Sequence, residues 1–153
     1  MSAAGASAIE ELVERLYAAL LAGDGAAIEG LLAPDFDGLL APGLPLGLGG
    51  SKRGPAAMRD DGWWAIGRAF AVRAQLRESI ECADGRLLVL GRYAGRARSS
   101  GREFEAEFAH LWSARDGRLC ALRQYTDTAL WVAALEPVAP VEPTDSEPGH
   151  DPG

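Results

Sequence analysis

The sequence is short of cysteine, of basic residues and of long apolar runs. Two cysteines, Cys82 and Cys120, are too few for a disulfide framework, and they predict free thiols in a reducing, cytoplasmic compartment. The 15 Lys and Arg residues are outnumbered by 22 Asp and Glu, and the net charge of −7 argues against nucleic acid or an anionic membrane as partner. No apolar run is long enough for a transmembrane helix, and no basic segment followed by an apolar one opens the chain, so we expect no signal peptide.

Motifs of several enzyme classes are missing too. The glycine-rich segment 41–54 has no strand–GxGxxG–helix context and no Gly-Lys-Ser/Thr, so it does not match a phosphate-binding loop. The only histidines are His110 and His150, and no Cys/His spacing typical of a metal site occurs. No Gly-x-Ser-x-Gly or Ser-His-Asp arrangement is present. We therefore expect neither a cofactor nor a metal.

The composition is that of one globular domain. Hydrophobic residues make up 48% and charged residues 24% of 153 residues, a length that can bury a substantial core. Residues 1–7 are expected to be disordered, residues 8–135 to form the domain, and residues 136–153, rich in Pro, Glu and Asp, to form a disordered acidic tail.

The first half of the chain predicts mainly helices. Ser7 followed by Glu10 has the spacing of a capping box. The apolar residues after it recur with helical spacing: Ile9, Leu12, Val13, Leu16, Tyr17, Leu20 and Leu21. Further elements follow in order: a helix over 24–32 that Asp24 can cap and Pro34 ends, a strand over 36–40, a loop over 41–54, and a helix from Pro55 to about Phe70.

The second half predicts four strands and a last helix. Alternation of period two marks strands over 72–83, 86–99, 102–115 and 118–126, joined by the dipeptides Asp84-Gly85, Ser100-Gly101 and Asp116-Gly117. A final helix reaches Leu135. If each dipeptide forms a two-residue turn, the pairing sorts side chains onto two faces, and a slip of one residue would exchange them.

One face of this predicted sheet is aromatic and carries a few ionisable groups. Glu78, His110 and Arg123 fall in one row across it, with Gly91 leaving space in the middle. Tyr93, Phe108 and Tyr125 form the next row, with Trp112 nearby and Asp127 at the strand end. Gln124 is expected to point to the other face. Such a face is typical of a sheet that lines a cavity.

The order of elements and two segments resemble a known superfamily. The segments are ELVERLYAALLAGDGAAIEGLLAPDF and EFAHLWSARDGRLCALRQYTDTALW, and the chain resembles the SnoaL-like group of the NTF2-like (cystatin-like) superfamily over about residues 8–135. The resemblance implies an α+β cone, in which a curved antiparallel sheet wraps around N-terminal helices and encloses a pocket. It also implies a frequent homodimer through the outer sheet face. Members include polyketide cyclases, steroid isomerases, epoxide hydrolases and pocket proteins without known activity.

Candidate catalytic residues follow from the aromatic face. His110 can act as a general acid or base near neutral pH, and the alternative is a hydrogen-bonded core histidine. Arg123 can stabilise an enolate or oxyanion, and the alternative is an ion pair with Glu78 or Asp127. Asp127 can act as a base, cap the last helix, or do both. In related cyclases and isomerases an acidic residue commonly stands on the last long strand, and here Gln124 stands beside that place.

A hydrophobic, oxygenated small molecule is the expected ligand. Tyr17, Tyr93 and Tyr125 can donate hydrogen bonds to it, and the role of Tyr17 is implied by steroid isomerases that use a tyrosine of the first helix. The flat rings expected around the ligand are those of Trp63, Phe108 and Trp112, with Glu78 beside them. The first hypothesis is a cofactor-independent isomerase, aldol-type cyclase or epoxide hydrolase. The alternative is a binding or dimerisation module without turnover.

Overall fold

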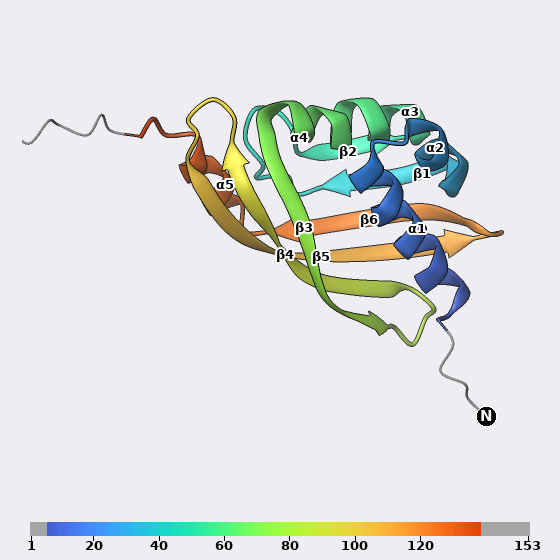
Figure 1. The fold of residues 1–153 in the computed structure, drawn as a ribbon. Helices are drawn as coiled ribbons and strands as arrows, with labels where there is room; N and C mark the ends of the chain where they lie inside the picture. Colours follow the sequence, from blue (N-terminus) through green and yellow to red (C-terminus); the bar gives the residue numbers. More distant parts are fainter. Residues whose placement is uncertain (1–5, 139–153) are drawn as a thin grey trace, which may run out of the picture.

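A curved six-stranded sheet with helices against its inner face forms the fold (Figure 1). The computed structural model describes residues 6–138. The strands lie side by side in the order β2-β1-β6-β5-β4-β3. Their bounds are β1 Leu32–Leu40, β2 Gly50–Arg53, β3 Phe70–Glu81, β4 Leu87–Ala97, β5 Glu103–Arg115 and β6 Arg118–Thr126. Neighbouring strands pair antiparallel except β1 and β6, which pair parallel. The predicted α+β architecture with a curved sheet and N-terminal helices is confirmed.

The disordered ends expected over residues 1–7 and 136–153 lie largely outside the described residues. Residues 1–5 and 139–153 are not among them. The domain bounds of 8–135 stay a prediction; within the described residues, α1 begins at Ala8 and Leu135 follows the last residue of α5.

Side-chain caps define the first two helices. Helix α1 spans Ala8–Ala22, and the Ser7 hydroxyl accepts a hydrogen bond from the backbone N–H of Glu10 at 3.3 Å. Gly23 ends the helix with φ 68°, a left-handed conformation that suits glycine. Helix α2 spans Gly25–Leu31, and the carboxylate of Asp24 accepts from the N–H of Ala27 at 3.1 Å. Both predicted starts are therefore correct.

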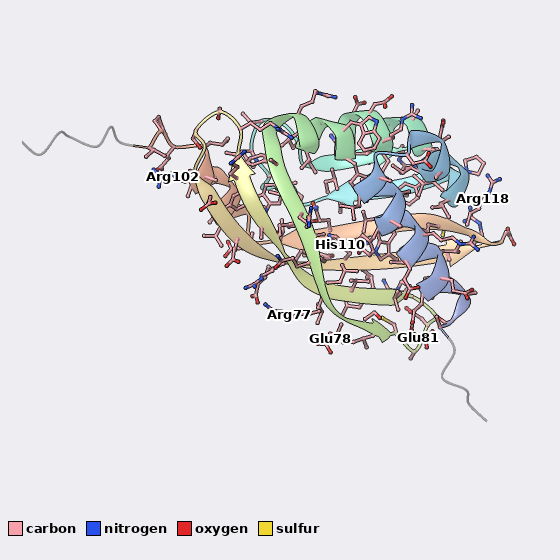
Figure 2. The ribbon with its side chains drawn as sticks, viewed as in Figure 1. Arg77, Glu78, Glu81, Arg102, His110 and Arg118 are labelled. Atoms are coloured by element: carbon pink, nitrogen blue, oxygen red, sulfur yellow. The ribbon has the colours of Figure 1, made fainter. Side chains whose placement is uncertain are left out.

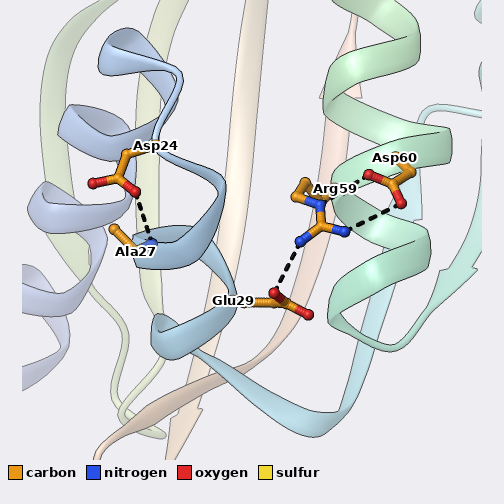
Figure 3. Close-up of polar contacts among 5 residues, drawn as sticks. All are labelled: Asp24, Ala27, Glu29, Arg59 and Asp60. Carbon is orange, nitrogen blue, oxygen red and sulfur yellow. Dashed lines mark hydrogen bonds and ion pairs between the residues drawn. The ribbon is translucent and has the colours of Figure 1, made fainter.

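The third helical stretch is continuous from Pro55 to Ala69. It comprises α3 Pro55–Ala57, the π-helical turn η1 Met58–Trp63 and α4 Trp64–Ala69. Pro55 occupies the start of the helix, where its missing N–H costs nothing. Figure 3 shows how the stretch is tied to α2: the Arg59 guanidinium lies 2.9 Å from Glu29 and 2.8 Å from Asp60. The last helix, α5 Thr128–Ala134, buries Trp131.

The segment 41–54, predicted to be loop throughout, departs from that prediction at its end. Residues 50–53 form β2, which pairs with β1 and forms the sheet edge. Strand β1 is also longer than predicted, because it begins at Leu32 and not at Phe36. The loop before β2 folds back onto the domain, and Leu44 and Leu48 join the core.

The side chains predicted for the inner face of β4 and β5 are correct, although the predicted pairing of the two strands is not. Val89 faces His110 and Gly91 faces Phe108, two residues away from the predicted partners, because the turn after Ala97 is longer than two residues. A shift of two preserves the face of every side chain. Tyr93, Phe108, His110 and Trp112 are therefore buried, as expected. His110, labelled near the centre of the domain in Figure 2, belongs to β5, and its side chain contacts Tyr17 of α1.

A bulge in the β5–β6 hairpin overturns the predicted face of β6. Arg115 faces Arg118 as expected, but the register shifts between Ser113 and Ala114, so that His110 faces Gln124 and Phe108 faces Thr126. One extra residue on a strand moves every following side chain to the other face. Gln124 is therefore buried, and the expected inward placement of Arg123 and Tyr125 is wrong: Arg123 is exposed and Tyr125 is 55% exposed.

The first hairpin also differs from its predicted register. Near the turn, Glu81 faces Leu87, one residue away from the predicted pairing. The register then shifts again between Leu76 and Glu78. Glu78 consequently pairs with Leu90 instead of Gly91, and it is exposed on the edge strand instead of standing in a row with His110.

Gly91 is required for close packing and does not leave the empty space we expected. A Cβ built on it would meet the carbonyl oxygen of Gln75 and lie 2.8 Å from a ring carbon of Phe108. The Phe108 ring thus occupies the position above Gly91, where only glycine fits.

We predict that Gly91→Ala lowers the free energy of unfolding by about 1–3 kcal/mol, since the added methyl has no room. Gly67→Ala is the matched control, because a Cβ at this α4 position meets nothing within 4 Å. It should raise stability by up to about 1 kcal/mol. Urea unfolding followed by circular dichroism measures both, and equal effects of the two substitutions would contradict the packing at Gly91.

Candidate functional site

A cavity of about 150 Å³ opens between α1 and the edge of the sheet formed by β3 and β4. The apolar part of its wall consists of Val13, Leu76, Leu87 and Val89, together with Tyr17. Its mouth is polar and carries Glu10, Glu14, Arg77, Glu78 and Ser79. A cavity of about this size holds a single benzene ring in a known engineered case. The cavity therefore fits one ring of a ligand, and a larger ligand would project through the mouth.

Behind the cavity wall, His110 is held between two tyrosine hydroxyls. Its Nδ1 lies 2.7 Å from the hydroxyl of Tyr17, on α1, and its Nε2 lies 2.6 Å from the hydroxyl of Tyr93, on β4. The indole N–H of Trp112 donates to the Tyr17 hydroxyl at 3.1 Å. The ring of Phe108 stacks on the imidazole, with 4.0 Å between the ring centres. The imidazole is thus paired at both nitrogens and enclosed by rings.

The network continues to β6 and to the loop that follows β1. The side-chain amide of Gln124 donates to the Tyr93 hydroxyl at 2.8 Å. The amide oxygen of Gln124 accepts from the backbone N–H of Ala41 at 3.1 Å. Gln124 is 4% exposed and His110 5% exposed, so these bonds are shielded from water.

Burial determines the protonation of the three ionisable groups. It lowers the pKa of His110 to about 3, so the imidazole is neutral at physiological pH. It raises the pKa of Tyr17 and that of Tyr93 above the ordinary value, with a smaller opposing effect of the hydrogen bonds from Trp112 and Gln124. Both hydroxyls therefore keep their hydrogens. In this state His110 is a poor proton acceptor for a substrate and a good hydrogen-bond partner for the tyrosines.

Several predicted site residues are brought together and others are not. Tyr17, Tyr93, Phe108, His110 and Trp112 form one cluster, and Trp63 packs on Trp112 with 6.5 Å between ring centres. Glu78 lies at the cavity mouth. Arg123 and Tyr125 lie on the outer face. Asp127 is exposed at the start of α5, and its side chain makes no capping hydrogen bond there. The cavity touches Tyr17 but not His110 among the described residues.

Sequence reasoning missed Gln124 and two carboxylates of α1. Glu10 and Glu14 line the cavity together with Tyr17. The spacing 10, 14 and 17 was the available signal, because residues three and four apart share a helix face. For Gln124 the signal was the three-residue spacing of Leu119 and Leu122, both buried, which strict alternation does not allow.

Within the described residues, no three His, Cys, Asp or Glu side chains gather in a way that could hold a metal ion. Across the same part of the chain, every helix falls short of the length and apolarity needed to cross a membrane.

Comparison with known proteins agrees with this architecture. Residues 13–122 match the family of SnoaL-like domains. The chain belongs to the SnoaL-like family. No curated protein matches this SnoaL-like chain. Its sheet and helices are similar to an NTF2-like protein from Burkholderia thailandensis, with 27% identity, a TM-score of 0.75, and coverage of 83% of this chain and 96% of that chain.

Two further solved structures contain small molecules. TerC, co-crystallised with polyporic acid, is 27% identical, with a TM-score of 0.74 and coverage of 84% of the SnoaL-like chain and 98% of its own. A protein of ketosteroid isomerase-like fold from Catenulispora acidiphila, in complex with trimethylamine, is 16% identical, with a TM-score of 0.69 and coverage of 84% and 94%. At that lower identity the similarity shows the fold alone.

Burial of His110 predicts a pH-dependent stability. Its folded pKa of about 3 lies below the unfolded value of 6.5, so the unfolded chain binds the extra proton between them. The contribution is complete above the unfolded value and is lost as pH falls toward 3. We expect the free energy of unfolding to fall by up to about 1.4 kcal/mol per pH unit through this window, beyond what other groups contribute.

His110→Gln is the control, because glutamine does not titrate. The difference in unfolding free energy between wild type and His110→Gln, measured with urea at several pH values, should shrink as the pH falls. A difference that is constant from neutral to acid pH would contradict burial of a neutral imidazole.

Proposed function

We propose that this SnoaL-like protein is a cofactor-independent proton-transfer enzyme, of the isomerase or aldol-cyclase type, acting on a hydrophobic oxygenated small molecule. The observation that carries the proposal is Tyr17, which lines the cavity and whose hydroxyl belongs to a buried chain of hydrogen bonds. An apolar pocket with a few convergent polar groups is the usual form of a small-molecule site.

Tyr17 is proposed to stabilise the ligand oxygen. Its pKa is raised by burial, so the hydroxyl remains a donor when the carbonyl oxygen of a substrate gains negative charge on enolisation. Donors fixed before the reaction stabilise such charge most, because they need not reorient. His110 contacts Tyr17 and not the cavity, so its role here is to hold Tyr17 in place.

A carboxylate at the mouth is proposed as the base. Glu14 precedes Tyr17 by three residues on α1, so the two side chains share one face of the helix. Glu10 and Glu78 border the same opening. A carboxylate beside an apolar ring can remove the proton next to a carbonyl whose oxygen is held by Tyr17. Arg123, Tyr125 and Asp127 are left out of this site because they lie on the outer surface.

Acetophenone tests the oxygen site, since it is one ring with one carbonyl, and ethylbenzene is its hydrocarbon control. We expect Tyr17→Phe to lower the affinity for acetophenone about three- to tenfold, the contribution of one hydrogen bond. The affinity for ethylbenzene should stay unchanged. Calorimetry measures both affinities. Exchange of the acetophenone methyl protons in deuterated water, followed by NMR, should slow about a hundredfold in Tyr17→Phe and in Glu14→Gln.

Glu11→Gln is the matched control for Glu14→Gln, because Glu11 is exposed on α1 away from the cavity lining. It should exchange at the wild-type rate. Circular dichroism verifies that each variant is folded. Binding without any catalysed exchange would favour the alternative function, a ligand-binding module. That alternative is supported by His110, whose two ring nitrogens are both paired and which does not line the cavity. If neither acetophenone nor ethylbenzene binds, the proposal that the cavity accepts one-ring ligands is wrong.

We also propose a homodimer through the outer face of the sheet. Ile80 faces Leu88, and Leu88 faces Leu111, so apolar side chains cross three strands there, with Ile80 43% and the nearby Tyr125 55% exposed. Ion pairs border this row: Arg77 with Glu107 at 3.3 Å and Arg92 with Glu105 at 3.6 Å. An apolar centre with a polar rim is the usual pattern of an interface.

Light scattering after gel filtration tests the dimer. Leu88→Glu should convert a dimer into a monomer, because it introduces a charge into the centre of the proposed interface. Leu21→Glu is the control, since Leu21 is 73% exposed on α1, away from the outer sheet face. A monomeric wild type, or equal behaviour of both variants, would contradict this interface.

The free Cys82 and Cys120 support the further proposal of a reducing, cytoplasmic location.

A further inference from the structure

Three hydrogens compete for two contacts around His110. The hydroxyls of Tyr17 and Tyr93 each carry one hydrogen, and the neutral imidazole carries one more, on either Nδ1 or Nε2. Only two oxygen–nitrogen contacts join the three side chains, at 2.7 and 2.6 Å. One hydroxyl hydrogen must therefore point elsewhere. Which hydroxyl has the spare hydrogen depends on the imidazole tautomer.

The orientation of Gln124 is determined by the backbone. The N–H of Ala41 can only donate, so the group 3.1 Å from it must be the amide oxygen of Gln124. The amide nitrogen is then the group 2.8 Å from the hydroxyl of Tyr93, and it donates to that oxygen. Exchanging the two ends of the amide would place two donors against each other at Ala41.

The donation from Gln124 determines the hydrogen of Tyr93. With one lone pair already used, the hydroxyl hydrogen needs an acceptor, and His110 Nε2 is the one in contact with it among the described residues. If Nε2 carried the hydrogen, Tyr93 would receive two donors, and its own hydrogen would have no acceptor in this cluster. The Tyr93 ring packs there against the rings of Phe108 and Trp131, with 4.6 and 5.1 Å between ring centres. A buried donor without an acceptor is costly.

The imidazole hydrogen then lies on Nδ1 and points at Tyr17. The Tyr17 oxygen accepts from Nδ1 at 2.7 Å and from the indole of Trp112 at 3.1 Å, which uses both lone pairs. Its own hydrogen has no acceptor within this cluster, and Tyr17 is the member that borders the cavity. The alternative tautomer would turn the Tyr17 hydrogen inward, toward His110.

We propose that Gln124 is a positioning residue, which acts through Tyr93 and His110 to turn the Tyr17 hydroxyl hydrogen into the cavity. The hydrogen bonds then run in one direction, from Ala41 through Gln124, Tyr93 and His110 to Tyr17. Bonds aligned in this way polarise one another and strengthen the terminal donor. The site therefore selects ligands that present a hydrogen-bond acceptor, a carbonyl or enolate oxygen. This deepens the proposed function and specifies the substrate class.

The tautomer of His110 can be measured without any ligand. Nitrogen-15 NMR distinguishes a protonated from an unprotonated ring nitrogen by chemical shift, and His150, the only other histidine, is assigned with His150→Gln. We expect His110 protonated at Nδ1 and free at Nε2 near neutral pH. The reverse assignment in the wild type would overturn the inference, and a failure of the proposed ligands to bind would not affect it.

Gln124→Glu should reverse the chain once the introduced carboxyl is ionised. A carboxylate only accepts, so Tyr93 would donate to it, His110 would donate from Nε2, and Tyr17 would donate to Nδ1. We expect the His110 tautomer to change to Nε2-protonated as the pH is raised until the carboxyl carbon shift reports ionisation. Acetophenone affinity should fall about three- to tenfold over the same transition.

Gln75→Glu is the matched control, because Gln75 is exposed and bonds to Arg92 on the outer face. It should change neither the tautomer nor the affinity. A merely structural role for Gln124 would lower the stability of Gln124→Glu and leave the tautomer as in the wild type. That result, with an ionised carboxyl, would also overturn the inference.

Discussion

A neutral imidazole enclosed by rings must have both nitrogens paired, and that requirement organises this domain. The partners of His110 come from distant parts of the chain: Tyr17 from α1 and Tyr93 from β4. Their own partners add β6, through Gln124, and the loop after β1, through Ala41. Each of these bonds also joins two elements of the fold. The same contacts that hold α1 on the sheet therefore also fix Tyr17, a residue of the cavity lining.

The bulge in the β5–β6 hairpin is the feature that completes this set. It moves Gln124 to the inner face, opposite His110, and turns Arg123 and Tyr125 outward. Without it a guanidinium would face the imidazole inside the core, where an unpaired charge is far more costly than an amide. The bulge thus exchanges a charged interior for a neutral network in which each polar side chain has a partner.

Much of the fold was predictable from local signals. The caps at Ser7 and Asp24, Pro55 at a helix start and the alternation over residues 102–115 each act over a few residues, and each was correct. The inner placement of His110 and its aromatic neighbours followed from the same alternation. The resemblance to SnoaL-like domains supplied the arrangement of helices around the sheet.

The register was the part that local signals did not determine. Loop lengths and bulges depend on how strands pack across the sheet, and an error of one residue reverses a face while an error of two does not. That is why β5 was predicted correctly and β6 was not. The parallel pairing of β1 with β6 and the short β2 arise from long-range contacts of the same kind.

The first donor in this series of hydrogen bonds is the backbone N–H of Ala41, which lies where β1 ends and the loop 41–49 begins. Leu44 and Leu48 anchor this loop in the core, while Leu46 faces solvent. Changes in loop length or sequence can therefore alter how firmly Ala41 presents its N–H without touching the cavity. Substitutions in this loop could therefore be selected in laboratory evolution to change reactivity without changing the shape of the cavity.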